Sequence, residues 1–315
     1  MADFQTEVFD LIKRQLEAWP TAKANFEALR DVRSKRLDVD GWQLGVQFNP
    51  ARAVSSGAKV DAASIKARPC FLCEANRPEV QEGFRYKPYD NEYEVLVNPF
   101  PIFPHHLTIP SVKHEPQRIK GRVRDMLQIA EELQSHTVFY NGPRCGASAP
   151  DHMHFQAGDL SLFNIDEYIL GMDGQPIAHS ENAELLLYDK GPLRFFTIIC
   201  DPRHLDEAEA LFDRLYAAMP VPEGEEEPMM NVLAYRVAVG DLLVVIPRKR
   251  HRPSFYGTEG EGKMMLSPAA VDMGGLFITP READFDDLDD ETVKQVFEEL
   301  TLSKKEIDKI AADVK

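Results

Sequence analysis

One short pattern occurs twice in the chain, and it limits the fold more than any other sequence feature. Leu107–Pro116 and Val244–Pro253 align at a constant offset of 137 residues, with Ile-Pro, a basic residue, His and Pro in matching places. An apolar, strand-like run leads into each Ile-Pro pair. We interpret the match as an internal duplication of one module that contains both helices and strands.

Periodicity predicts strands and helices in both halves, which indicates an α+β fold of duplicated modules, with antiparallel sheets and helices packed on them. We expect N-terminal helices in residues 1–40, a first module in 41–185 that holds the active site, a second in 186–288 and a C-terminal helix in 289–315. Residues 51–66 are mostly small and polar, as in a loop, and Pro222–Pro228 reads as an exposed acidic loop. The predicted strands are 42–48, 93–98, 106–110, 137–140 and 193–200, and the predicted helices are 3–18, 22–30, 117–135, 205–218 and 290–314.

Composition limits the kinds of partner. The 315 residues are 43% hydrophobic and carry a formal net charge of −16, which suits a globular protein and disfavours binding to long nucleic acids. No apolar run is long enough to cross a bilayer, and the N-terminus lacks a signal-peptide pattern, so we expect a cytoplasmic protein without membrane contact. A small anionic substrate stays possible where basic residues gather locally.

The stretch with the clearest chemistry joins an apolar run, Thr137–Tyr140, through a Gly/Pro/Ser loop to His152, His154 and Gln156. Backbone N–H groups of such a loop can cradle an anion. In an extended segment the side chains of alternate residues point to the same face. Two histidines and a glutamine after an anion-binding loop therefore suggest chemistry on phosphate, with either a metal pair or a nucleophile and its supports.

A metal site is one interpretation. Cys70 and Cys73 lie on a Cys-x-x-Cys knuckle that lets both sulfur atoms reach one ion. With His114 and His152 they would make a Cys₂His₂ set suited to tetrahedral zinc, which the fold would have to assemble from distant segments. His105 and His106 compete for the third position, and redox chemistry or plain packing of the two thiols stays open.

A nucleophile is the other interpretation. If a metal holds His152, then His154 is free to attack phosphorus as a neutral imidazole, and Gln156 can donate its amide to a phosphate oxygen. Arg144, in the loop, is the preferred phosphate-binding cation, while Arg52, Arg68, Arg77 and the basic run Arg248–Arg252 are weaker candidates. Met264–Thr279, in roughly the corresponding region of the second copy, has no histidine, so we expect only the first half to be catalytic.

These residues also resemble a known family. Ser148–Gln156 is similar to the His-x-His-x-Gln motif of the nucleotidyltransferase branch of the histidine-triad superfamily, which includes galactose-1-phosphate uridylyltransferase, diadenosine tetraphosphate phosphorylase and GDP-hexose phosphorylase. His-x-His-Phe-Gln is the GDP-hexose phosphorylase form, and Ser267–Gly275 followed by Glu282–Phe285 resembles the C-terminal segment of those enzymes. Cys70-Phe71-Leu72-Cys73 with His114 and His152 resembles the zinc set of uridylyltransferases. The resemblance covers about residues 40–285.

The resemblance implies a fold of two HIT-like modules and a covalent mechanism. His154 would be the catalytic nucleophile, Gln156 its phosphate-binding partner, and Cys70, Cys73, His114 and His152 the ligands of a structural zinc ion. The segment Asn141–Ser148 would bind phosphate, with Asn141, Arg144, Gly146 and Ser148 as the candidate residues. Gln156, where related hydrolases carry a third histidine, implies transfer in place of hydrolysis.

The function expected from this reasoning is nucleotidyl transfer from a nucleotide sugar or dinucleoside polyphosphate to phosphate, as in a phosphorylase. The acceptor could instead be a sugar phosphate, as in a hexose-1-phosphate uridylyltransferase. A nucleotide-binding protein without turnover and a redox or metal-storage protein built on Cys70 and Cys73 are the alternatives. The partners expected are these small molecules, while the oligomeric state stays open, with a homodimer as one possibility.

Overall fold

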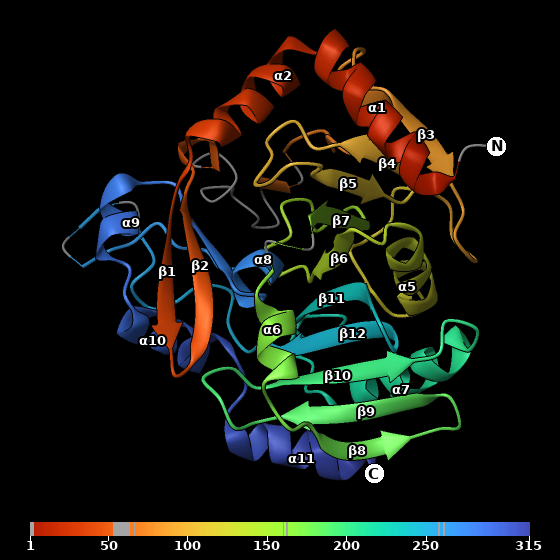
Figure 1. The fold of residues 1–315 in the computed structure, drawn as a ribbon, viewed down its shortest axis with the longest axis vertical. Helices are drawn as coiled ribbons and strands as arrows, with labels where there is room; N and C mark the ends of the chain where they lie inside the picture. Colours follow the sequence, from red (N-terminus) through yellow and green to blue (C-terminus); the bar gives the residue numbers. More distant parts are fainter. Residues whose placement is uncertain are drawn as a thin grey trace.

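The computed structural model describes residues 3–52, 64–65, 67–159, 161, 163–257, 259–260 and 262–315. One wide sheet runs through the molecule, with helices on it and a smaller sheet at its side (Figure 1). This arrangement confirms the predicted α+β class. Most of the loop predicted over residues 51–66 lies outside the described residues. None of the described helices is long and apolar enough to span a lipid bilayer.

The wide sheet has ten strands among the described residues, and every neighbouring pair in it is antiparallel. Their order is β3-β4-β5-β7-β6-β11-β12-β10-β9-β8, and β6 and β11 form the seam between two five-stranded halves. The bounds are β3 Gly83–Tyr86, β4 Tyr93–Val97, β5 Leu107–Pro110, β6 His136–Asn141, β7 His154–Asp159, β8 Gln175–His179, β9 Ala183–Tyr188, β10 Phe195–Cys200, β11 Met230–Val237 and β12 Gly240–Pro247.

The two halves repeat one topology. Read from the outer edge inward, the strand orders are β3-β4-β5-β7-β6 and β8-β9-β10-β12-β11, and a helix follows the third strand of each half: α5 (Val123–Glu132) and α7 (Leu205–Ala218). The duplication is therefore present, but β5 corresponds to β10, and β12 corresponds to β7. The alignment of Leu107–Pro116 with Val244–Pro253 was wrong because both segments are buried strands that end in Ile-Pro.

The true counterpart of the histidine strand is therefore β12 and not Met264–Thr279. The face of β12 that shares a core with Phe139 and Leu233 carries Leu242, Val244 and Ile246. An apolar face has no group for acid–base or nucleophilic chemistry. The second half thus lacks counterparts of the two histidines, as expected, although the expectation was based on Met264–Thr279 and not on β12. Strand β8 and the first part of β9 fall within the residues expected for the first module, but both strands pair in the second half.

Each face of the wide sheet packs against its own hydrophobic core. On one face lie α1 (Phe4–Ala18), α5, α7 and α11 (Lys304–Val314), and Phe155 and Ala157 of β7 point into this core. Side chains alternate along a strand, so His154 and Gln156 point to the opposite face. The position of the two candidate catalytic residues thus follows from which residues of β7 the helices bury.

The opposite face is covered by a second sheet and short helices. In this sheet β1 (Arg33–Val39) pairs antiparallel with β2 (Trp42–Phe48), and β13 (Leu276–Thr279) adds in parallel. Trp42, buried here, stacks against Tyr168 and Phe297. The remaining helices are α2 Pro20–Glu27, α6 Ile165–Leu170, α8 Ala270–Met273, α9 Glu282–Asp287 and α10 Asp290–Leu300.

Two predicted helices differ from the structure. The helix expected over 117–135 is shorter, Val123–Glu132, because residues 117–119 have no regular structure and Lys120 and Gly121 form a turn with Gly121 at a φ of 74°. The single C-terminal helix expected over 290–314 is two helices, α10 and α11. Ser303 caps α11 and shares a capping box with Glu306, a sequence signal for a helix start that the periodicity had hidden.

The acidic loop expected to be exposed is partly buried. Glu227 is 3% exposed, and its carboxylate accepts hydrogen bonds from the Tyr140 hydroxyl and from the Ile119 N–H. Burial raises the pKa of Glu227 to about 7, against these hydrogen bonds. This loop therefore links β6 to the segment that precedes α5 and is more than a solvated turn.

Candidate active site

A cavity of about 1000 Å³ lies beside the ends of β5, β6 and β7, on the face opposite the helices α5 and α7. Its volume exceeds what one nucleotide needs and suits a nucleotide sugar or a dinucleotide. Trp19 and Thr21, at the junction of α1 and α2, line one part, and α8 lines another. Of the predicted residues, those that line this cavity are Asn141, Gly146, Ser148, His154 and Gln156.

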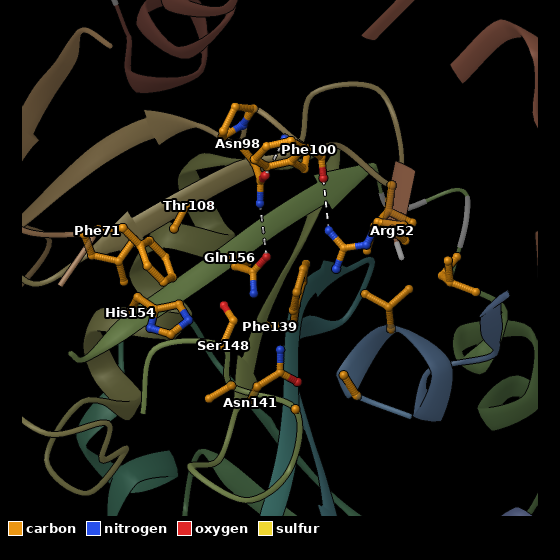
Figure 2. A pocket seen from close by; sticks show the side chains of 18 of the residues that line it. Arg52, Phe71, Asn98, Phe100, Thr108, Phe139, Asn141, Ser148, His154 and Gln156 are labelled. Atoms are coloured by element: carbon orange, nitrogen blue, oxygen red, sulfur yellow. Dashed lines mark hydrogen bonds between the residues drawn. The ribbon is translucent and has the colours of Figure 1, made fainter. Parts of the chain in front are cut away.

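His154 is the first residue of β7, and its imidazole points into the cavity near Ser148 and Gln156 (Figure 2). The Nδ1 atom lies 2.8 Å from the backbone oxygen of His152. A carbonyl can only accept, so Nδ1 carries the hydrogen and Nε2 keeps its lone pair. Burial lowers the pKa of His154 to about 4. The side chain is therefore a neutral imidazole with Nε2 available as a nucleophile.

Gln156 is held by a histidine that we had considered as a metal ligand. His106 accepts a hydrogen bond from the Ile102 N–H at Nδ1 (3.2 Å), so its Nε2–H donates to the Gln156 Oε1 (2.9 Å). Asn98 Nδ2 lies 3.5 Å from the same oxygen. With its oxygen engaged, Gln156 presents its NH₂ group to the cavity (Figure 2). Burial lowers the pKa of His106 to about 3, which keeps the ring neutral for this role.

Gln117 is a positioning residue that the sequence reasoning missed. Its fully buried side chain accepts a hydrogen bond from the His154 N–H (2.8 Å) and donates to the backbone oxygens of Asn141 (2.9 Å) and His154 (3.0 Å). It therefore bridges β6 and β7 where their own ladder ends, beyond Phe139 and Gln156. The signal in the sequence was Pro116 before it and Gly121 after it, which disfavour the helix in which we had placed Gln117.

The loop after β6 brings three predicted residues to the cavity. Asn141 ends β6, and the Ser148 hydroxyl points into the cavity, while its carbonyl accepts from the Arg68 guanidinium (3.0 Å). Gly146 has a φ of 101°, and a Cβ on it would lie 2.4 Å from the Cβ of Ala269. Only glycine allows the loop to approach the start of α8 this closely.

Arg144 does not line the cavity. Its side chain is 62% exposed and pairs with Glu225 at 2.6 Å, so the acidic loop attracts it away from the site. Three other arginines line the cavity: Arg52, which donates to the Phe100 oxygen, Arg68, and Arg252, which donates to the Ser267 hydroxyl. The position of Arg144 in the loop does not reveal where its side chain points. The sequence therefore favoured Arg144 over these three arginines as the phosphate-binding residue.

The four predicted metal ligands meet at one point. One donor atom from each of Cys70, Cys73, His114 and His152 lies within 4.8 Å of the others. The Sγ–Nδ1 distances are 3.2 Å for Cys70 with His152, 3.2 Å for Cys73 with His114 and 3.6 Å for Cys73 with His152. Ligand atoms of a tetrahedral Cys₂His₂ zinc site are separated by similar distances. Neither His105 nor His106 belongs to the cluster.

A hydrogen bond prepares His152 for a metal. Its Nε2 lies 2.7 Å from the backbone oxygen of Ser111, which places the hydrogen on Nε2 and leaves the Nδ1 lone pair facing the two cysteines. His152 precedes β7 and points to this cluster, not into the cavity, so the expectation that it shares a face with His154 and Gln156 was wrong. One short segment thus connects the two sites, because His152 belongs to the metal cluster and His154, two residues later, lines the cavity.

The fold is shared with proteins of known structure. Crystal structures of the yeast Ap4A phosphorylase Apa2 match at 20% sequence identity, with 90% of this chain and 94% of that chain covered and a TM-score of 0.58. The complex of Apa2 with Ap4A matches at 20% identity, 90% and 97% coverage and a TM-score of 0.60. The complex with AMP matches at 19% identity, 91% and 96% coverage and a TM-score of 0.56. At these identities the match establishes the fold.

The fold is therefore shared with an Ap4A phosphorylase, and two family models match parts of the sequence. Residues 226–315 match the family model described as GDPGP1-like, C-terminal domain. Residues 11–159, which carry Cys70, Cys73 and both motif histidines, match a model described as a domain of unknown function, DUF4922. No curated protein matches the sequence.

Proposed function

We propose that the protein is a phosphorylase that transfers a nucleotidyl group through a covalent intermediate on His154. The observation that carries the proposal is the hydrogen bond from His154 Nδ1 to the His152 carbonyl, which leaves Nε2 nucleophilic inside a cavity of nucleotide-sugar size. The substrate class is a nucleotide sugar, with a dinucleoside polyphosphate as the runner-up. The GDPGP1-like match of the C-terminal part favours the former, and the fold shared with Ap4A phosphorylase the latter.

The reaction has two displacement steps at the same phosphorus. His154 Nε2 attacks the α-phosphorus, a P–N bond forms, and the bond to the bridging oxygen breaks, so that the sugar 1-phosphate leaves. Inorganic phosphate then attacks the same phosphorus and breaks the P–N bond, which releases a nucleoside diphosphate and restores His154. The amide N–H of Gln156 donates to a non-bridging oxygen as negative charge builds on it.

The Cys70, Cys73, His114 and His152 cluster fits zinc in number, type and spacing of ligands. Four protein ligands leave no open coordination position, so the role of the ion would be structural. By holding His152, the ion would fix the carbonyl that sets the His154 tautomer. The convergence of two histidines on Cys70 and Cys73 supports a metal-binding role over a redox role, because thiol–disulfide exchange does not require two histidine ligands.

The proposal is tested by labelling. The protein is incubated with GDP-, UDP- and ADP-sugars and with dinucleoside tetraphosphates that carry ³²P at the α-phosphate. We expect acid-labile label on the protein, absent in His154→Ala and present in His179→Ala, whose histidine is exposed on β8. Added phosphate should release the label as a nucleoside diphosphate. Absence of label with every substrate would leave the second candidate, a nucleotide-binding protein without turnover.

A sugar phosphate as acceptor is distinguished in the same assay. If labelled protein returns its nucleotide to a hexose 1-phosphate and not to inorganic phosphate, the protein is a uridylyltransferase-like enzyme. Arg252 and Ser267, which line the cavity and are hydrogen-bonded to each other, are our candidates for contacting the acceptor phosphate.

A further inference from the structure

The amide of Asn141 has one orientation in the site. Its Oδ1 accepts two hydrogen bonds, from the Asn231 Nδ2 (3.0 Å) and from the Ala270 N–H (2.7 Å). An amide oxygen held by two donors leaves the NH₂ group on the other side, and in Figure 2 the nitrogen of Asn141 points into the cavity. The cavity therefore receives two amide donors, one from Asn141 and one from Gln156.

Asn231 is the side chain that, together with the Ala270 N–H, sets this orientation, and it comes from the other half of the molecule. It lies on β11, directly opposite Asn141 across the β6–β11 seam, and is fully buried. Its Nδ2 also donates to the Cys145 carbonyl (2.8 Å), and its Oδ1 accepts from Arg248. A guanidinium can only donate, so Arg248 fixes which end of the Asn231 amide faces Asn141.

Arg248 follows β12 and is 2% exposed. Its other hydrogen bonds go to the backbone oxygens of Pro268, Arg250 and His251. Within the part of the chain that the structure describes, no carboxylate lies within ion-pair distance of it. A buried cation held only by carbonyl and amide oxygens is costly for the folded state, so a stabilising ion pair does not account for it.

We propose that Arg248 and Asn231 are positioning residues of the phosphate site. Arg248 orients Asn231, Asn231 orients Asn141, and Asn141 Nδ2 donates to a non-bridging oxygen of the nucleotide phosphate. This inference rests on the proposed function, because it assumes that the cavity holds a nucleotide. It gives the half of the sheet without catalytic histidines a defined part in substrate binding.

The deciding variant is Asn231→Asp, which keeps the shape of the side chain and an acceptor for Arg248. A carboxylate cannot donate to the Asn141 Oδ1 and repels it, so only the Ala270 N–H still favours the original orientation, and the Asn141 NH₂ group is drawn away from the phosphate and toward Asp. Loss of a hydrogen bond to a charged group lowers affinity about 10- to 100-fold. We expect that loss for a nucleoside monophosphate and no change for the corresponding nucleoside, which lacks the phosphate.

Binding is measured by calorimetry with guanosine and GMP, uridine and UMP, and adenosine and AMP, using the pair that the unaltered protein prefers. Arg248→Met should show the same selective loss, and Arg248→Lys, which still donates to Asn231, should restore most of the affinity. Arg250→Met is the matched control, because this side chain is 54% exposed and pairs with Glu299. If Arg248→Met does not fold, Asn231→Asp decides alone.

The outcomes distinguish failure of the positioning role of Asn231 from failure of the proposed function. Equal loss of nucleoside and nucleotide affinity in Asn231→Asp would mean general damage to the pocket and would overturn the positioning role. Unchanged nucleotide affinity would overturn it as well. If the unaltered protein binds none of the nucleotides, it is the proposed function that fails, before any variant is compared.

Discussion

Replacement of Gln117 by methionine should destabilise the protein strongly, although the two side chains have similar length. The change removes one acceptor and two donor contacts at a site that is 0% exposed. It leaves without partners the His154 N–H and the backbone oxygens of Asn141 and His154. Each buried group left unpaired costs roughly 1–3 kcal/mol, so we expect a loss of about 3–5 kcal/mol in the free energy of unfolding.

The assay is chemical denaturation followed by far-ultraviolet circular dichroism, with the denaturation midpoint and slope compared between variants. Gln134→Met is the control, because Gln134 is exposed and its replacement should change stability by less than about 0.5 kcal/mol. Nucleotidyl transfer by Gln117→Met should also fall under conditions where the protein stays folded, because His154 loses its backbone anchor. A stability loss below about 1 kcal/mol would refute the view that Gln117 bridges β6 and β7.

Replacing His114 by alanine should abolish stoichiometric zinc, measured by elemental analysis, whereas exposed His179 should tolerate the same change; zinc retained at one equivalent would contradict the four-ligand site. His106→Leu frees the Gln156 oxygen, so the rate of nucleotidyl transfer should drop about 10- to 100-fold, and an unchanged rate would show that Gln156 needs no partner. Glu227, with its pKa raised to about 7 by burial, keeps its proton in the folded state to near neutrality, while the unfolded chain loses it near the ordinary value of 4.5. Stability should therefore fall by up to about 3 kcal/mol as the pH rises from about 4.5 to 7, and Glu227→Gln should flatten that part of the pH–stability curve.

The sequence predicted elements whose pattern is local. Alternation and helical periodicity gave β2, β4 and α7 to within a few residues, and the spacing of His154 and Gln156 gave their shared face, because a strand alternates wherever it lies. The cysteine knuckle and two distant histidines were grouped by their chemistry. In each of these cases the helix, strand or cluster is formed by the same residues that show the pattern in the sequence.

Features decided by distant contacts escaped prediction. Strand β1 has the sequence Arg-Ser-Lys-Arg-Leu-Asp-Val and was missed, because it is largely exposed and, among the described strands, pairs with β2 alone. Arg144 was expected at the phosphate site, but an acidic partner 81 residues away holds it outside. Gln117 and His106 act through hydrogen bonds to β7, and no pattern in their own segments shows those bonds.

The seam between β6 and β11 also has a consequence for the order of events during synthesis. Residues up to 159 contain every predicted metal ligand and both catalytic candidates, yet Asn231, Arg248 and the start of α8 are translated later. Because a nascent chain folds from its N-terminus, the first half would emerge with β6 as an unpaired edge and with an incomplete phosphate site. The proposed phosphate site would therefore be complete only after Asn231, Arg248 and Ala270 have been synthesised and have packed against β6.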